Sequence, residues 1–561
     1  MKLLIDNREL ELADHERLNA IQAARRVGIE IPHYCWHPGL SVAGSCRMCL
    51  IEVGTREAKT GRVAMLPKLV PACNTLVKDG TVLVTNSEKV QQARAMVEED
   101  LLLRHPIDCP ICDKAGECFL QDYHFQYGQE QRRADVRPFS SRRRDVGETI
   151  TLFVDRCILC SRCVRFTREI SGTGELMLVG RGAQEEIDVL PGFPLANNLS
   201  GNVVDLCPVG ALADKDFLYR QRVWFLRRHA GVCTGCSTGC SIWVEENQDR
   251  VWRIKPRENP QVNQWWICNE GRYGYPHVHS DRRLLRPVQR EAGQASAHQW
   301  QELVPELARR LKAVGRLAGV LSPHLTVEEA WLLATLLRTV DAQAMLFLGP
   351  VPEAGTDETF PNGFTIHAEK CPNRRGVEKV LAHFTRRVLP FEELLAKLKG
   401  RGVGGVWVSG GYKDLSQNGP SQVGRSGKTE LPTGSGAGFK NEWMDEPTAA
   451  CFAGLDLLVV QDLFPSPLSA RATFELPGVA FAEREGTYVN FNDQLQCVRR
   501  AVRPPSGVRS EASLYWELLG RQGLYDARAV LSEVARQIAY FAPAAGDVPE
   551  TGVDLKVNWL A

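Results

Sequence analysis

The distribution of cysteine constrains this chain more than any other feature of its sequence. Fifteen of the 18 cysteines lie before residue 270, and they fall into tight groups with short spacings. Charged residues follow Met1 within a few positions, so we expect no signal peptide and a cytoplasmic chain. In such a chain, grouped cysteines are typical of metal or cluster ligands rather than disulfides. The remaining three are expected to be buried free thiols: Cys371, Cys451 and Cys497.

The first group has the order C-x10-C-x2-C-x23-C and consists of Cys35, Cys46, Cys49 and Cys73. Gly39 and Gly44 lie nearby, and a cluster-binding loop needs such residues because backbone N–H groups must approach the sulfur atoms. The order resembles the plant-type [2Fe–2S] ferredoxin pattern with a longer first gap. Zinc also accepts four thiolates, but zinc knuckles usually pair two C-x2-C units, and only one is present here. We therefore expect a [2Fe–2S] cluster.

The second group combines a histidine with three cysteines inside fourteen residues: His105, Cys109, Cys112 and Cys118. A lone histidine among prolines would more often be a surface residue. Three cysteines beside it indicate a metal site instead, because thiolate and imidazole together are ligands of soft or borderline metals and of iron–sulfur clusters.

The third group is a C-x2-C-x2-C run closed by a remote Cys-Pro, which is the bacterial ferredoxin arrangement. Position 167 is Thr and no second such run precedes Cys207, so the group should hold a single [4Fe–4S] cluster. Its candidate ligands are Cys157, Cys160, Cys163 and Cys207.

The fourth group has the order C-x2-C-x3-C-x27-C, again with glycine beside its cysteines. It could build a zinc site, but its position after three cluster motifs favours a further [4Fe–4S] cluster. Its candidate ligands are Cys233, Cys236, Cys240 and Cys268.

Charge and hydropathy exclude several classes of protein. The net charge of +1 gives no sign of nucleic-acid binding or of an electrostatic membrane anchor. No apolar run approaches the roughly 18 residues of a membrane span. With 561 residues, the chain is long enough for several domains with cores of their own.

The C-terminal half has an α/β rhythm. Strands are expected at 317–321, 344–348, 405–408 and 457–460, and helices from the capping box Thr326–Glu329 through Arg338 and over 391–398. Short apolar strands that alternate with helices predict a parallel sheet covered on both faces. The Gly- and Ser-rich stretch 412–445 is interpreted as an insertion or linker.

The four ordered ligand groups resemble the large iron–sulfur subunit of respiratory complex I, NADH-quinone oxidoreductase. The wording of Ser45–Cys49, His105–Cys112 and Arg162–Phe166 supports the resemblance over residues 1–275. It implies an α+β and α/β multidomain protein: a [2Fe–2S] ferredoxin-type domain (1–78), a [4Fe–4S] domain with one histidine and three cysteine ligands (79–145), a [4Fe–4S] ferredoxin-type domain (146–222), a molybdopterin-oxidoreductase-type [4Fe–4S] domain (223–280) and a shortened, degenerate molybdopterin-oxidoreductase-like domain (281–561).

The resemblance also implies a function. Electrons would arrive from NADH through a flavin on a partner subunit and leave towards quinone through other iron–sulfur subunits. The implied partners are the flavin/NADH-binding subunit, a small [2Fe–2S] subunit and the quinone-module subunits. The chain would lie peripherally on the cytoplasmic side of the inner or plasma membrane, without a membrane span and without a complete active site of its own.

Molybdenum is not expected. Active molybdopterin relatives usually follow the last cluster cysteine with x-Lys-Gly, and Glu270 stands at the lysine position here. Cys371 is the only cysteine at a tempting distance for a molybdenum ligand, and its surroundings match no ligand loop. The alternative function, the catalytic subunit of an NAD-linked formate dehydrogenase, would require that metal.

Overall fold

The computed structural model describes residues 1–57, 59–131, 133–291, 293–411 and 443–556. It divides into two units: Met1–Phe225 with Phe360–Asn362, and Leu226–Thr359 with Gly363–Ala561. The stretch 412–445 that we interpret as an insertion lies almost wholly outside the described residues. Within those residues, no helix is both long enough and apolar enough to cross a membrane.

The first unit begins with the hairpin of β1 (Lys2–Ile5) and β2 (Arg8–Glu11), as predicted. Asp6 and Asn7 at its turn have φ values of 45° and 67°, the left-handed conformation that a type I′ turn requires at both central positions. The hairpin belongs to a sheet of order β2-β1-β6-β3-β4, in which β1 and β6 are parallel and β5 pairs with β3. The further strands are β3 (Leu50–Arg56), β4 (Val63–Met65), β5 (Val70–Pro71) and β6 (Thr81–Val84).

Helix α1 (Ala20–Arg26) packs on this sheet. Asn19 and Gln22 form a capping box at its start, and Gly28, at φ 74°, follows its end, as the sequence predicts. Ile21 contributes to a core that also contains side chains from β1, β3 and β6. This core includes Cys49 and Cys73, so the first ligand group is attached to the packed part of the domain.

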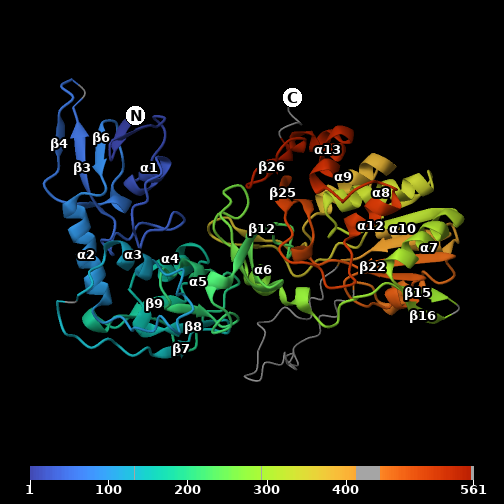
Figure 1. Cartoon of the computed structure of the whole chain (residues 1–561), viewed down its shortest axis with the longest axis horizontal. Coiled ribbons are helices and arrows are strands. Elements are labelled where there is room, and N and C mark those ends of the chain that lie inside the picture. Colours follow the sequence, from blue (N-terminus) through green and yellow to red (C-terminus); the bar gives the residue numbers. More distant parts are fainter. Residues whose placement is uncertain (58, 132, 292, 412–442, 557–561) are drawn as a thin grey trace. The chain divides into compact units, whose positions relative to one another are not determined.

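Helix α2 (Glu88–Leu102) follows the sheet and contacts both β3 and α3 (Figure 1). Its extent agrees with the helical period over 88–103 in the sequence. The Ser87 side chain caps it by accepting from the Val90 backbone N–H. The other elements of the unit are α3 (Phe119–Tyr127), β7 (Arg143–Asp145), β8 (Ile150–Phe153), α4 (Arg162–Glu169), β9 (Leu176–Val179), β10 (Glu186–Val189), α5 (Asn202–Leu206) and β11 (Leu212–Asp214).

The second unit begins with an antiparallel three-stranded sheet and a short helix. These elements are β12 (Arg227–Val232), β13 (Ser241–Asn247), β14 (Arg250–Pro256) and α6 (Asn269–Tyr273). A second small antiparallel sheet consists of β24 (Gly486–Val489), β25 (Gln494–Val498) and β26 (Val553–Asp554). Strands β12 and β25 are in contact, so the fourth cysteine group rests on the C-terminal part of the unit.

The main sheet of the second unit has seven strands within the described residues, in the order β16-β15-β23-β22-β21-β17-β18. Five of them are parallel, as predicted: β17 (Leu317–Leu321), β18 (Met345–Leu348), β21 (Gly405–Ser409), β22 (Leu457–Asp462) and β23 (Phe474–Pro477). The purely parallel order is wrong at one edge, where β15 (Val288–Glu291) and β16 (Gln294–Ala297) form an antiparallel hairpin. A connection this short permits only antiparallel pairing.

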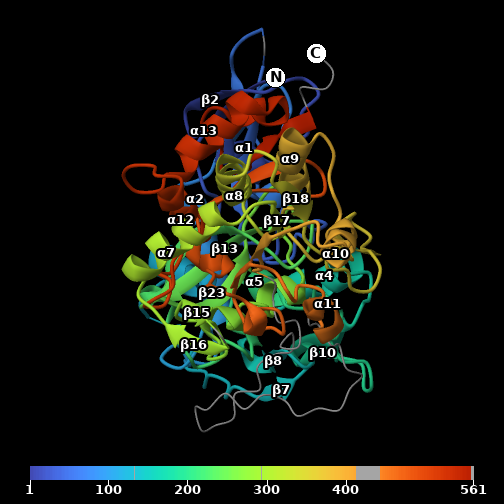
Figure 2. The ribbon, with the colours of Figure 1, turned by 90° about the vertical axis from the view of Figure 1, so that its right-hand side faces the viewer.

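Helices cover both faces of this sheet, which confirms the expected layering (Figure 2). Side chains alternate along the strands: Leu321 faces the larger core, whereas Val320 faces the smaller one. On the larger side lie α7 (Trp300–Ala313), α8 (Val327–Val340), α9 (Arg374–Thr385), α12 (Glu511–Leu518) and α13 (Ala527–Gln537). On the other side lie α10 (Phe391–Lys399) and α11 (Glu446–Ala450).

The three single cysteines do not share one environment. Cys371 is buried, as expected. The expectation is wrong for Cys451 and Cys497, which are half-buried. Cys451 lies at the end of α11, and Cys497 borders an open pocket of about 740 Å³ whose walls include Arg499 and Arg528.

A buried charge cluster joins the C-terminal segment to α8. The Arg484 side chain is 4% exposed and lies 3.0 Å from Glu329 and 3.4 Å from Glu511, both of which are buried as well. It also donates to the His324 carbonyl at 3.0 Å. One cation thus compensates two carboxylates that have no access to water.

We expect the Arg484→Met variant to lower the free energy of unfolding of the second unit by about 3–5 kcal/mol, because two buried carboxylates lose their counter-charge. Urea denaturation followed by tryptophan fluorescence measures the loss. Arg503→Met is the matched control: Arg503 lies 2.6 Å from Asp249, but its side chain is 80% exposed, so the loss should stay within about 1 kcal/mol. Equal losses in the two variants would contradict this account.

Candidate cluster sites

The first cysteine group converges at the edge of the N-terminal sheet. Cys49 immediately precedes β3, and Cys73 lies in a short 3-10 turn after β5; the Ala72 N–H donates to the Cys49 carbonyl at 2.9 Å and fixes one segment against the other. Arg47 has φ 61°, a left-handed conformation that bends the loop between Cys46 and Cys49. Three of the four thiols are buried, and Cys46 is half-buried.

Direct contacts among the sulfur atoms perturb the titration of this group. A hydrogen bond with Cys46 lowers the pKa of Cys35 and raises the pKa of Cys46. Hydrogen bonds with Cys35 and Cys49 raise the pKa of Cys73. The sequence-predicted ligands are thus brought together as one set.

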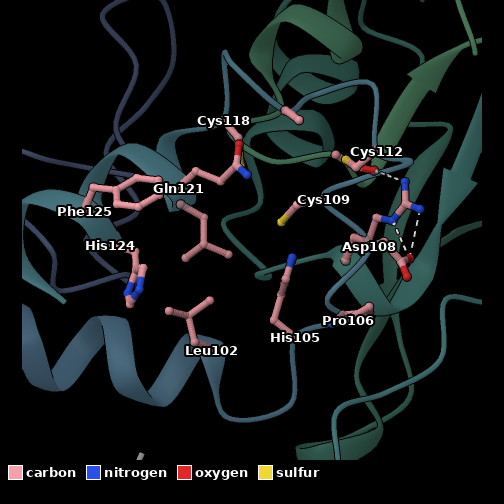
Figure 3. Close-up of a pocket in the computed structure, with 14 residues that line it drawn as sticks. Leu102, His105, Pro106, Asp108, Cys109, Cys112, Cys118, Gln121, His124 and Phe125 are labelled. Carbon is pink, nitrogen blue, oxygen red and sulfur yellow. Dashed lines mark hydrogen bonds and ion pairs between the residues drawn. The ribbon is translucent and has the colours of Figure 1, made fainter. Parts of the chain in front are cut away.

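The second group lines a pocket of about 170 Å³ together with α3 residues. Figure 3 shows the His105 ring and the Cys109 thiol directed towards each other into this space. Burial, followed by the charge of Arg156, lowers the pKa of His105 to about 4, which leaves a neutral imidazole near pH 7. Burial raises the pKa of Cys118 to about 11. All four predicted ligands border the same pocket.

Arg156 connects this pocket to the third group. It directly precedes Cys157, and its guanidinium donates to Asp108, next to Cys109, at 2.9 Å. A second close approach occurs at Gly210, where an added Cβ would lie 2.2 Å from the Cys112 sulfur. Only glycine therefore fits between the Cys207 segment and Cys112.

The third group surrounds the start of α4. Leu159 and Ser161 have φ values of 53° and 59°, and these left-handed turns between successive cysteines direct the thiols to one side of the loop. Burial, and then the neighbouring thiols Cys160, Cys157 and Cys207, raises the pKa of Cys163 far above its usual value. The four predicted ligands of this group are therefore neighbours.

The fourth group lies between β12, β13 and α6. The Gly235 N–H donates to the Cys233 sulfur at 3.4 Å, and the Gly271 N–H donates to the Cys268 sulfur at 3.3 Å. Burial, and then the other thiols of the group, raises the pKa of Cys240 far above its usual value. Backbone donors aimed at sulfur are the interactions by which proteins tune iron–sulfur clusters.

Glu270 has a partner that spacing could not reveal. The Lys370 ammonium lies 2.7 Å from the Glu270 carboxylate. Burial lowers the pKa of Lys370, but Glu270 and, more weakly, Cys236 and Cys268 outweigh it, so the pKa is raised overall. A lysine one hundred positions downstream thus brings positive charge to the fourth group. No sequence signal identifies it, because only the fold joins the two segments.

The donor sets fit iron–sulfur clusters. All cysteines of the described residues are free thiols. Buried sets of four lose their protons readily only when a positively charged metal centre lies between them. In the described part of the chain, no three His, Cys, Asp or Glu side chains are arranged as ligands of a single metal ion. A cluster is wider than an ion, since its ligands bind different iron atoms.

Four family models match consecutive parts of the chain, and each matched range contains one ligand set. They are a 2Fe-2S iron-sulfur cluster binding domain (1–88), an NADH-ubiquinone oxidoreductase-G iron-sulfur binding region (94–133), an NADH-quinone oxidoreductase subunit 3 ferredoxin-like domain (147–213) and a molybdopterin oxidoreductase Fe4S4 domain (226–280). These matches confirm the predicted types of the first four domains.

Curated relatives agree with the family models. The NADH-quinone oxidoreductase-G protein of Rickettsia felis is 35% identical over 340 residues, which cover 60% of this chain and 49% of that protein. The NADH-ubiquinone oxidoreductase 75 kDa subunit of Reclinomonas americana is 36% identical over 59% of this chain and 47% of its own length. The chain thus spans about half the length of the curated relatives it matches.

A chain of a solved NAD⁺-reducing [NiFe]-hydrogenase is also similar, at 27% identity over 40% of this chain and 90% of that chain. Its TM-score of 0.31 is too low to support a shared overall fold. The ordered family models and the curated relatives lead to one conclusion. Over the 60% of its length that the alignments cover, this chain is a homologue of the large iron–sulfur subunit of NADH-quinone oxidoreductase, the 75 kDa subunit of complex I.

Proposed function

We propose that this chain is an electron-transfer iron–sulfur subunit of the peripheral arm of NADH-quinone oxidoreductase, which relays electrons from NADH and flavin towards quinone. The observation that carries the proposal is the convergence of four ligand sets in one chain, each within a matching family model. Turnover belongs to the assembly, and the chain supplies no complete active site. Its partners are the flavin/NADH-binding subunit, the small [2Fe–2S] subunit and the quinone-module subunits, and it lies peripherally on the cytoplasmic side of the membrane.

The proposed ligands are the sixteen residues of the four sets. Cys35, Cys46, Cys49 and Cys73 hold a [2Fe–2S] cluster, and the other three sets, His105 with Cys109, Cys112 and Cys118, Cys157 with Cys160, Cys163 and Cys207, and Cys233 with Cys236, Cys240 and Cys268, each hold a [4Fe–4S] cluster. When bound, such clusters supply one-electron redox chemistry without bond making. We retain the domain boundaries after residues 78, 145, 222 and 280.

Within the first unit, we assign the Cys157–Cys207 set the middle position. Its loops contact the second set through Arg156 and Gly210, and they contact the first set through Arg165, which donates to the Cys35 carbonyl. The order of the sets along the sequence therefore differs from their proposed order in the relay. The chain's own residues exclude water from the thiols and hold the three loops together.

The first test is metal content. We expect about 14 iron atoms and matching labile sulfide in the chain purified without oxygen, because one [2Fe–2S] and three [4Fe–4S] clusters contain that number. Cys268→Ser should remove about four iron atoms. Cys451→Ser, outside every set, should remove none.

Other metal contents have distinct meanings. About 10 iron atoms in the wild-type chain would contradict the fourth cluster alone. Zinc without sulfide would contradict the whole proposal. Molybdenum or tungsten with pterin would favour the formate dehydrogenase alternative.

The second test concerns His105. His105→Cys should keep its cluster and lower the reduction potential by on the order of 100 mV, because a thiolate adds negative charge where imidazole adds none. His105→Ala should lose or degrade the cluster. Electron paramagnetic resonance of the reduced protein during a redox titration measures both effects.

His124 provides the matched control, since it lines the same pocket as His105. His124→Ala should leave the signal and its potential unchanged. If His124→Ala removed the signal while His105→Ala preserved it, the histidine ligand would be His124 and the assignment of His105 would be wrong.

A further inference from the structure

Helix α4 carries two arginines between the first and third ligand sets. Arg162 and Arg165 flank Cys163 in the Arg162–Phe166 motif, whose charged residues the proposed ligand sets leave unexplained. Both lie within the first unit, as do both ligand sets.

Arg165 joins the backbone of the two sets directly. One terminal nitrogen of its guanidinium donates to the carbonyl of Cys35, a ligand of the first set, at 2.5 Å. The same nitrogen donates to the carbonyl of Cys160, a ligand of the third set, at 3.3 Å. Its other terminal nitrogen donates to the Ser41 carbonyl, in the loop between Cys35 and Cys46.

Arg162 makes a parallel connection and is almost completely buried, at 4% exposure. It donates to the carbonyl of Trp36, next to Cys35, at 2.6 Å and to the carbonyl of Leu206, next to Cys207, at 3.2 Å. Glu169 of the same helix accepts from the Ser41 N–H at 2.8 Å. Three side chains of one helix therefore fix the loop of the first set against the third.

The charges of these two arginines have no carboxylate partner. Within the described residues, their guanidinium groups donate only to backbone carbonyls and to the Ser161 hydroxyl. Arg156, which connects the second and third sets, differs because Asp108 lies 2.9 Å away and compensates its charge. A buried cation without a counter-ion is costly unless negative charge lies close by. The nearest source here is the thiolates of the two ligand sets.

We propose that Arg162 and Arg165 act as positioning residues that supply one shared region of positive charge to the first and third cluster sites and raise the reduction potentials of both. The inference rests on the proposed function, since it requires clusters at these sites. Reduction adds an electron to a site, and a fixed positive charge nearby stabilises the reduced form. Because the same guanidinium contacts both loops, its removal should move both potentials in the same direction.

The experiment is a redox titration of the full chain followed by electron paramagnetic resonance. The [2Fe–2S] signal reports the first site, and the [4Fe–4S] signal lost in Cys160→Ser identifies the third. In Arg165→Gln we expect the reduced-to-oxidised ratio at fixed potential to fall about tenfold at both sites, equal to a downward shift of about 59 mV for one electron. Arg165→Lys keeps the charge and should restore both ratios to within about twofold of wild type.

Arg168→Gln is the matched control. Arg168 lies on the same helix but is exposed, so solvent screens its charge and both ratios should stay within about twofold of wild type. This control separates the placement of the charge from the net charge of the helix.

Each outcome has a defined meaning. Unchanged potentials in Arg165→Gln, or a shift at only one site, would overturn the proposal. If Arg165→Gln binds too little iron for titration, Arg165→Lys decides: wild-type potentials support the shared charge, and a tenfold downward shift at both sites overturns it. A wild-type chain without these signals would instead contradict the proposed function, so the two failures are distinguishable.

Discussion

The burial of grouped thiols is the constraint on which the rest of the structure depends. Four sulfur atoms gathered away from water cannot all ionise unless positive charge is supplied among them. Burial and neighbouring thiols raise the pKa of Cys163, Cys240 and Cys268 far above the usual value. The sets are held in this unfavourable arrangement by left-handed turns such as Leu159 and by close packing against Gly210. The folding energy of the surrounding domains thus keeps four ligands ready for one cluster each.

Arginine side chains convert these separate sites into a connected group within the first unit. Arg156, Arg162 and Arg165 each donate to the loops of two different sets, and each lies next to or between ligands of the third. Planar guanidinium groups suit this task, because several donors leave one rigid group in fixed directions. The fourth set receives its positive charge differently, from Lys370 paired with Glu270.

The second unit uses its sheet for packing. At the carboxyl ends of β17 and β21, where open α/β sheets commonly bind ligands, the Ser409 hydroxyl accepts from the Ser322 N–H at 3.0 Å and donates to the Val320 carbonyl at 2.9 Å. Arg484 lies close by, paired with Glu329. The chain's own polar groups thus satisfy one another at this edge, and they tie the two strands together.

Local patterns in the sequence determined a great deal. The spacing of cysteines, the Thr326–Glu329 capping box and the apolar strand 317–321 depend on residues that are near one another in the chain, so periodicity and ligand spacing predicted them correctly. The tertiary structure alone decided what distant residues do. It placed an antiparallel hairpin at the sheet edge, left Cys451 and Cys497 half-buried, and brought Lys370 to Glu270 and Arg165 to Cys35. These contacts join segments up to 130 positions apart, and such pairings arise from the packing of whole elements, which no local spacing encodes.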